Sequence, residues 1–448
     1  MRPVYLFLRI TLPYAFSIFF RRRNIINSQR KLYAQTIFVC NHPSAFIDPL
    51  AISNAMWPIV HFMTRSDVFK VWLKPITWAC HMVPIYRAEQ DGAGTYEKNK
   101  KVFSGVKRVL AKKRSLIVFG EGYTDDVFIR SLKPMKKGAA RIGFGTMDAS
   151  DWKLDIKIQV CGVNYSDPSK FRSDMVVSCG KLIHLQDYKE LYLENPAKAI
   201  NQLTKDIGEE LQKNITYLKD KKKSAFLENL ITLTRKGMNQ DHYERSLSVE
   251  QRYRYTQALA NRINEEQVDE DEKWLALQEK TDEYFKKLKR KNLQDNQVND
   301  YVKAGKTKSL FMKFLGLFVT LPVFIAGVIH NIIPYILVKT FVEKIFKRRV
   351  FWSGVKMVLG GLVWLLMYLP LFWYMPDLIK LNISETGYFY FTLMYFLMVV
   401  PFTFVWAYEW RRIWRRTMKL YRAKSPELAE LSVERKALID QMNKMGIQ

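Results

Sequence analysis

Residues 36–48 read Thr-Ile-Phe-Val-Cys-Asn-His-Pro-Ser-Ala-Phe-Ile-Asp, an apolar run that passes directly into a polar turn. The first five residues are mostly β-branched or aromatic, which is typical of a buried strand. Asn41 or Ser44 can cap a helix that begins in the turn, and Pro43 is favoured in the first turn of a helix. The stretch therefore predicts a strand, a turn and a helix, the unit from which α/β folds are built, with His42 at the end of the strand.

His42 and Asp48 are chemically suited to act together. A histidine can take the proton of an alcohol because it titrates near neutral pH. A carboxylate on its other ring nitrogen would fix the tautomer and stabilise the imidazolium that forms. A histidine and proline after a strand are more often ordinary turn residues, so the rest of the chain has to support the catalytic interpretation.

Two further apolar runs end in polar residues. Residues 115–118 (Ser-Leu-Ile-Val) precede Phe-Gly-Glu-Gly-Tyr-Thr at 119–124, and residues 82–86 (Met-Val-Pro-Ile-Tyr) precede Arg87. Taken alone, Gly-Glu-Gly is more often a tight turn that needs a positive φ. A guanidinium at a strand end can bind a phosphate through two hydrogen bonds, although most single arginines are solvated surface charges.

Together with a looser match at residues 158–165, these three stretches resemble, in chain order, four sequence blocks of the superfamily of glycerol-3-phosphate and lysophosphatidic acid acyltransferases. The resemblance covers about residues 30 to 180. The resemblance implies an α/β fold with a mixed sheet flanked by helices. It makes His42 the general base and Asp48 its carboxylate partner.

The resemblance also assigns substrate-binding residues. It implies that Arg87 is a phosphate ligand and that Glu121 and Gly122 hold the glycerol-phosphate part of the acceptor. Lys136 lies in a basic stretch similar to the family's Lys-x-Gly-Ala helix start. It is a second phosphate candidate, with an ordinary solvated lysine as the alternative.

Several positions depart from the family pattern. Five residues separate His42 from Asp48 where four are commonest, a spacing similar to a branch that includes fungal glycerol-phosphate and dihydroxyacetone-phosphate acyltransferases. Gly120 stands where Pro is usual, and residues 158–165 match the fourth block only loosely and lack its proline. We interpret this last stretch as core. The departures leave the acceptor's identity less certain than the chemistry.

The implied reaction moves a fatty acyl group from a thioester, acyl-CoA or acyl carrier protein, to a hydroxyl of glycerol-3-phosphate or 1-acylglycerol-3-phosphate. It needs no metal or cofactor. Another lyso- or amino-lipid acceptor is an alternative, and a degenerate, non-catalytic lipid-binding scaffold is a second class. The chain has no Gly-x-Ser-x-Gly elbow, and its cysteines stand singly, at Cys40, Cys80, Cys161 and Cys179.

The composition points to an anionic partner. The formal net charge is +28, and 14% of the 448 residues are aromatic. Because no nucleic-acid-binding module is recognisable, we expect membrane lipids with anionic headgroups, and not nucleic acid, as the partner. Three long apolar stretches, 310–338, 356–375 and 388–408, agree with this, since about 20 helical residues cross a bilayer.

Basic residues predict the topology. They lie on both sides of 310–338, which contains Pro322 and Pro334, so we expect this stretch to be re-entrant. Residues 356–375 and 388–408 are then a transmembrane hairpin. The catalytic domain is expected on the cytoplasmic side of a cytoplasmic or inner membrane.

The composition changes along the chain predict five parts. Residues 1–25 form an interfacial membrane helix and residues 26–220 the acyltransferase domain. Residues 221–308 form a helical connector, in which a solvated helix is preferred to a specific binding function. Residues 309–420 form the membrane domain and residues 421–448 a helical tail.

Overall fold

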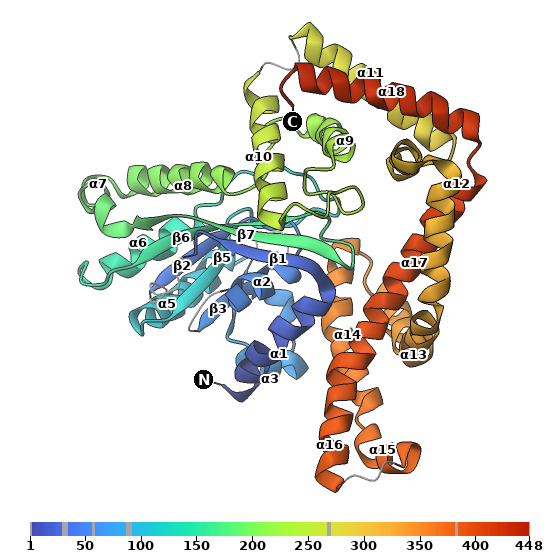
Figure 1. The fold of residues 1–448 in the computed structure, drawn as a ribbon. Helices are drawn as coiled ribbons and strands as arrows, with labels where there is room; N and C mark the ends of the chain where they lie inside the picture. Colours follow the sequence, from blue (N-terminus) through green and yellow to red (C-terminus); the bar gives the residue numbers. More distant parts are fainter. Residues whose placement is uncertain are drawn as a thin grey trace. The chain divides into compact units, whose positions relative to one another are not determined.

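The structure is a computed structural model that describes residues 2–28, 35–55, 59–86, 92–266, 270–380 and 384–447. The chain forms two compact units (Figure 1). The first contains Met1–Lys221 and Ser248–Asn261, and the second contains Lys222–Leu247 and Arg262–Gln448. Each unit is described by itself.

The first unit is built on a seven-stranded sheet in the order β1-β7-β6-β2-β5-β3-β4. Its strands are β1 Phe20–Ile26, β2 Thr36–Cys40, β3 Val60–Arg65, β4 Met82–Ile85, β5 Ser115–Phe119, β6 Lys157–Tyr165 and β7 Ser173–His184. Neighbouring strands are parallel, except that β6 and β7 are antiparallel. The sheet is therefore mixed, and β2, β5, β3, β4 and β6 all end at the same edge.

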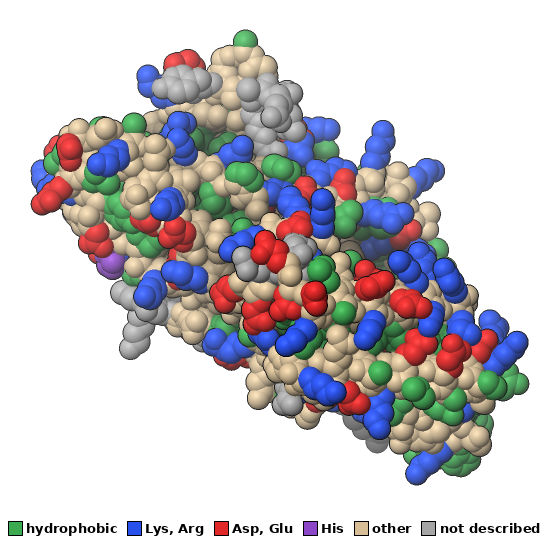
Figure 2. Space-filling model, turned by 90° about the horizontal axis from the view of Figure 1, so that it is seen from above, with side chains coloured by type: hydrophobic (Ala, Val, Ile, Leu, Met, Phe, Trp, Pro, Cys, Tyr) green, Lys and Arg blue, Asp and Glu red, His purple; other side chains and the backbone are tan. Residues whose placement is uncertain are grey.

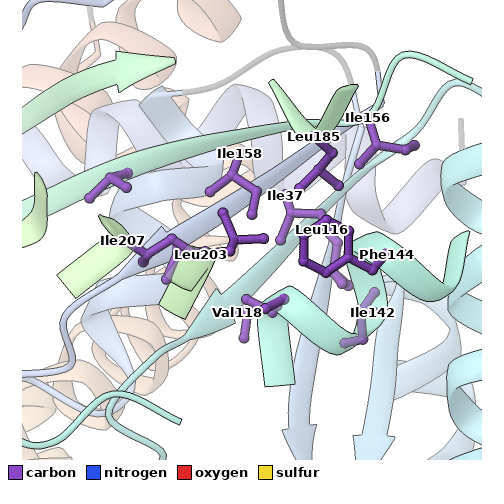
Figure 3. Close-up of a cluster of buried hydrophobic side chains, with 14 of the residues drawn as sticks. Ile37, Leu116, Val118, Ile142, Phe144, Ile156, Ile158, Leu185, Leu203 and Ile207 are labelled. Atoms are coloured by element: carbon purple, nitrogen blue, oxygen red, sulfur yellow. The ribbon is translucent and has the colours of Figure 1, made fainter. Parts of the chain in front are cut away.

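The strands predicted from sequence at 36–40, 82–86, 115–118 and 158–165 are confirmed as β2, β4, β5 and β6. Along β2 and β5, alternate residues face one side of the sheet, where Ile37 and Leu116 pack in one buried cluster (Figure 3). Ile142 and Phe144 of α6 (Gly138–Asp148) join this cluster, as do Leu203 and Ile207 of α8 (Pro196–Lys213). The core therefore fixes the central strands whose ends lead into the turns of His42 and Glu121.

Several further helices complete the first unit: α1 Pro3–Phe19, α2 Ile47–Ala55, α3 Lys74–Ala79, α5 Thr95–Ala111, α7 Lys189–Glu194 and α10 Val249–Glu265. The last residues of α10 belong to the second unit.

The helix after β2, α2, begins at Ile47, which is later than Pro43 suggests. Asn41 caps nothing there, because its side-chain amide exchanges two hydrogen bonds with the backbone of Val163, at 2.7 and 3.0 Å. The turn that carries His42 is thus tied to β6.

The first unit is not complete at residue 221, because α10 adds a buried ion pair to it. Arg252 and Asp174 are both fully buried and are paired at 2.5 Å, and Arg21 contacts the same carboxylate at 2.7 Å. A buried carboxylate is costly unless cations of this kind compensate it. Residues 248–261, which the sequence analysis assigned to the connector, therefore belong with the sheet.

The second unit is helical. Its helices are α9 Ser224–Thr234, α11 Glu272–Arg290, α12 Asp295–Val319, α13 Leu321–Ile345, α14 Trp352–Tyr368, α15 Leu371–Ile379, α16 Glu385–Met394, α17 Val400–Arg422 and α18 Ser425–Lys444. A π-helical turn over Tyr395–Val399 joins α16 to α17, and Gly305 kinks α12 with a φ of 68°. The tail predicted at residues 421–448 is helical from Ser425 to Lys444. The fold class, a mixed sheet with flanking helices followed by a helical C-terminal region, is confirmed.

Three helical segments in the described part of the chain are long and apolar enough to cross a membrane, by length and composition: Leu321–Ile345, Arg349–Tyr368 and Glu385–Arg422. They indicate a membrane-associated protein. The stretch 310–338 is divided at Thr320, and α13 continues through Pro334 without a break. Whether this stretch turns back inside the bilayer stays a prediction.

The high net charge is visible at the surface. Lys and Arg side chains lie over much of the face seen in Figure 2, with Asp and Glu between them. The chain has 71 Lys and Arg against 43 Asp and Glu, and a net charge of +28 favours contact with anionic surfaces.

Candidate active site

The structure brings His42 and Asp48 together. Nδ1 of His42 lies 2.9 Å from Oδ2 of Asp48. His42 follows the end of β2, and Asp48 lies in the first turn of α2, so the intervening loop absorbs the longer spacing. The imidazole also stacks on the ring of Phe119 at the end of β5, with 4.0 Å between ring centres. These contacts fix the orientation of the imidazole.

Asp48 is fully buried, and both of its carboxylate oxygens accept hydrogen bonds. Oδ2 accepts a second bond from the backbone N–H of Ser44, at 2.8 Å, and Oδ1 accepts one from the hydroxyl of Tyr165, also at 2.8 Å. Burial, together with the charge of Asp48, raises the pKa of Tyr165 well above its usual value. The tyrosine is therefore a permanent donor, and the carboxylate is held for His42.

Glu121 lies on the next polar turn and reaches the same loop. Its Oε1 accepts from the backbone N–H of His42 at 2.7 Å, and its Oε2 accepts from the backbone N–H of Lys133 at 3.3 Å. Burial raises the pKa of Glu121, and the bonds from His42 and Lys133 oppose that shift. Both carboxylate oxygens are thus engaged by the chain itself, which ties the loop of His42 to the loop of Glu121.

The two glycines of this turn are in different structural situations. Gly122 has a φ of +76°, which favours glycine. At Gly120, a Cβ would lie 2.1 Å from Cε of Met135, the far end of a flexible side chain that would have to shift. The backbone of the turn therefore favours glycine at position 122, whether or not Gly122 contacts a substrate.

A pocket opens beside His42. It is lined by Asn41, His42, Pro43, Glu121, Asp125, Val127, Phe128, Ile129, Arg130, Ser131, Lys133, Val163, Asn164, Ile215, Thr216 and Lys221. Two of its cations, Arg130 and Lys133, are buried. The ammonium group of Lys133 lies 3.2 Å from Asp125 and 3.8 Å from Glu121. The wall of the pocket therefore contains both the His42 imidazole and these two cations.

The residues predicted from sequence are only partly gathered at this pocket. His42 and Glu121 line it, and Asp48 stands behind His42. Lys136 is exposed and does not line the pocket, although its side chain lies against Gly122. Arg87 lies outside the described residues.

Sequence reasoning missed Tyr165 and Lys133. Tyr165 looked like a core residue of the fourth block, and nothing in its own neighbourhood shows that it reaches Asp48. Lys133 stands three residues before Lys136 in the same basic stretch, where the resemblance pointed to Lys136. Among the residues that the structure describes, no three His, Cys, Asp or Glu side chains gather as they would around a metal ion.

A comparison with known protein families matches the part of the chain that contains His42 and Glu121. Residues 21–161 match the family model described as Acyltransferase. Two proteins of Saccharomyces cerevisiae (strain ATCC 204508 / S288c), glycerol-3-phosphate O-acyltransferases 2 and 1, are 32% and 33% identical to this chain over 114 residues. The match spans 25% of this chain and 15% of the length of either yeast protein.

A solved structure also resembles the chain. It is the 1-acyl-sn-glycerophosphate (LPA) acyltransferase PlsC from Thermotoga maritima, with a TM-score of 0.30 and 15% identity over 46% of this chain and 79% of that one. The family match covers β2 and β5, the strands that lead to His42 and Glu121. Residues 21–161 therefore match an acyltransferase domain, and part of the chain is similar to glycerol-3-phosphate O-acyltransferases.

Proposed function

We propose that the protein is a membrane-bound glycerolipid O-acyltransferase of phospholipid biosynthesis. It transfers a fatty acyl group from a thioester donor, acyl-CoA or acyl carrier protein, to a hydroxyl of glycerol-3-phosphate or 1-acylglycerol-3-phosphate. The observation that carries this proposal is the 2.9 Å contact between His42 and a buried Asp48 in the wall of a pocket.

In the proposed reaction, His42 acts as general base. With Nδ1–H donated to Asp48, Nε2 is left to take the proton of the acceptor hydroxyl. The hydroxyl oxygen forms a bond to the thioester carbonyl carbon, and the carbon–sulfur bond then breaks. The departing thiolate takes the proton from the imidazolium, so the histidine returns to its starting state.

The surroundings support this role electrostatically. An imidazolium is stabilised by the carboxylate of Asp48, which is shielded from water and therefore acts strongly. Two donors other than the histidine, the Ser44 N–H and the Tyr165 hydroxyl, hold this carboxylate in place. Little rearrangement is then needed when charge develops on the ring.

The pocket supports a phosphorylated acceptor. Arg130 and Lys133 provide buried cations near His42, and guanidinium and ammonium groups are the side chains that bind phosphate. Arg87 and Lys136 stay predicted phosphate ligands. An unphosphorylated lyso- or amino-lipid acceptor would bring no anionic group to these cations.

A degenerate lipid-binding scaffold has less support. Such a module has no need to keep a histidine and an aspartate in hydrogen-bonding contact, whereas the catalytic pair is intact here. We further propose that the acyltransferase unit lies on the cytoplasmic side, since basic residues flank the apolar helices.

The test is an acceptor panel with purified, reconstituted protein. Radiolabelled glycerol-3-phosphate, 1-acylglycerol-3-phosphate and unphosphorylated lyso-lipids are each offered with acyl-CoA and with acyl carrier protein. We expect acylation of a phosphorylated acceptor, and a fall of roughly 10²–10⁴-fold in His42→Ala.

His184→Ala is the matched control, because His184 faces Asp155 at 3.7 Å on the surface, away from the pocket residues. It should keep full activity. No transfer to any acceptor, or more than about a tenth of the activity in His42→Ala, would overturn the proposal, since general-base loss is far larger than that.

A further inference from the structure

The outer face of α1 is apolar where a soluble helix would be polar. Tyr5, Leu12 and Phe16 are buried on its inner face. On the outer face, Phe7 and Ile10 are exposed, Ile10 with 68% of its surface. A helix that is apolar on both sides requires cover on both sides.

A second segment exposes even larger side chains. Between β3 and β4, the chain passes through Ser66–Ala79, which ends in α3. In this segment Trp72 is 71% exposed and Trp78 is 61% exposed. Two largely exposed tryptophans within seven residues are unusual on a water-soluble surface, and tryptophan is the residue enriched where membrane meets water.

The two segments form one surface, the apolar patch, which we define as Leu6, Phe7, Ile10, Val71, Trp72, Ile76 and Trp78. α1 contacts α3, and the two helices lie side by side in Figure 1. The guanidinium of Arg2 lies 3.9 Å over the ring of Trp78 and donates to the Trp78 carbonyl. The N-terminal end of α1 is thus fixed to the end of α3.

The charged residues around the patch indicate what kind of partner it fits. Residues 2–19 and 69–80 contain no Asp or Glu, and they carry Arg2, Arg9, Lys70 and Lys74. Lys70 and Lys74 are exposed, whereas the one carboxylate of the Ser66–Ala79 segment, Asp67, is paired with Arg65 at 2.6 Å. Large apolar and aromatic side chains bordered mainly by cations fit the interface of an anionic bilayer, where the rings reach the acyl boundary and the cations meet phosphates.

Both segments of the patch also reach the edge of the sheet that carries His42. Since β3 runs parallel to β5, and β5 to β2, Ser66–Ala79 leaves the sheet at the edge where β2 ends. β1 is antiparallel to β2, so α1 joins the sheet at that same edge, at Phe20.

We propose that the apolar patch is a membrane-docking surface of the acyltransferase unit, which inserts Trp72 and Trp78, together with the outer face of α1, into the headgroup region of an anionic bilayer. This contact is separate from the three long apolar helices of the other unit. It does not depend on the reaction assigned to His42.

Site-directed fluorescence on the full chain tests the proposal. Phe7→Cys and Trp72→Cys are labelled with the fluorophore NBD and reconstituted into phosphatidylcholine vesicles with and without phosphatidylglycerol. The four native cysteines are buried and can stay in place. We expect blue-shifted emission at both sites and quenching by spin-labelled lipid.

Leu193→Cys in α7 is the matched control, because Leu193 is 63% exposed and apolar but lies outside the patch. It should emit as in water and stay unquenched. The pair Lys70→Glu and Lys74→Glu, placed in the Trp72→Cys background, should lose most of the added quenching that phosphatidylglycerol gives.

Two results would overturn the proposal. Emission typical of water at Trp72→Cys would show that the patch stays in solvent. Blue-shifted emission that spin-labelled lipid does not quench would show that protein, and not lipid, covers it. Because each readout is independent of acyl transfer, an inactive preparation would still answer the question.

Discussion

The hydroxyl group of Tyr165 donates a 2.8 Å hydrogen bond to Oδ1 of Asp48, the carboxylate oxygen that His42 does not contact. Tyr165 ends β6 and is 117 residues away from Asp48 in sequence. The relationship makes Tyr165 a positioning residue, which acts on the reaction through the aspartate.

Tyr165→Phe should lower kcat by about tenfold, which corresponds to about 1.4 kcal/mol of lost stabilisation. Without the donor, the carboxylate is held less firmly against the imidazole, so the loss should appear in kcat while the acceptor KM stays the same. Initial rates measured over a range of acceptor concentrations check this.

The matched control for that variant is Tyr188→Phe. The Tyr188 hydroxyl donates to Asp206 at 2.6 Å, a similar bond in the same unit but outside the pocket. Tyr188→Phe should leave kcat unchanged. If Tyr165→Phe merely lowered the melting temperature, with the same kcat as the parent, its role would be structural.

Asp48→Asn should reduce kcat by roughly 10²–10⁴-fold with little change in the acceptor KM. An amide offers one acceptor oxygen where the carboxylate offers two, so it cannot satisfy both Tyr165 and the Nδ1–H of His42. Single-turnover rates together with KM separate the two quantities. A variant with a large rise in KM and normal kcat would place Asp48 in substrate binding.

Glu121→Gln discriminates between two roles of this residue. The structure engages the carboxylate with the backbone N–H groups of His42 and Lys133, which argues for positioning of the loop. We expect kcat to fall about tenfold while the acceptor KM stays within about twofold. A selective rise of the KM would return Glu121 to the acceptor-binding role that the family resemblance implies.

Two glycines give opposite stability predictions. A Cβ at Gly162 would lie 1.9 Å from the backbone oxygen of Asn214, which cannot move aside as a flexible side chain can. Gly162→Ala should therefore lose roughly 3 kcal/mol of unfolding free energy or more. Gly105, within α5, has open space around it, and Gly105→Ala should gain about 0.5–1 kcal/mol.

Thermal unfolding of the purified protein measures both changes. The parent and the two variants are compared in the same detergent. Equal melting temperatures for Gly162→Ala and the parent would mean that β6 can move away from Asn214.

The topology prediction rests on charge placement. Cysteines introduced beside Lys306 and beside Lys347 should react only with a membrane-permeant maleimide, and one beside Lys380 should react with an impermeant reagent from outside. Labelling of the Lys347 site from outside would instead make α13 a single span and place the C-terminal arginines outside. Variants with the native cysteines replaced by Ser or Ala exclude background labelling.

Local patterns predicted the strands and the turns that carry His42 and Glu121, because short apolar runs bounded by glycine and polar residues form strands in most contexts. They could not predict the start of α2, since that depends on where the Asn41 side chain finds its partners. The amide bonds Val163, a residue 122 positions away, and so leaves the helix without the expected cap.

The same limit applies to Tyr165, to Lys133 and to the two exposed tryptophans. A tyrosine in a strand has the same local pattern whether its hydroxyl meets water or a buried carboxylate. A run of basic residues does not show which lysine points into a pocket. The exposure of Trp72 and Trp78 is likewise a property of the folded surface, and the sequence contains no periodic signal for it.

The ion pair between Asp174 and Arg252 joins two parts of the chain that leave the ribosome at different times. A ribosome releases the whole sheet before it releases α10, so the nascent acyltransferase unit holds a buried, partly compensated carboxylate until residue 252 emerges. Residues 222–247, which fold with the other unit, are made in between. Catalytic fragments designed to stop near residue 220 should therefore be poorly soluble, whereas a version that joins residues 221 and 248 through a short linker keeps the pair and the sheet it completes.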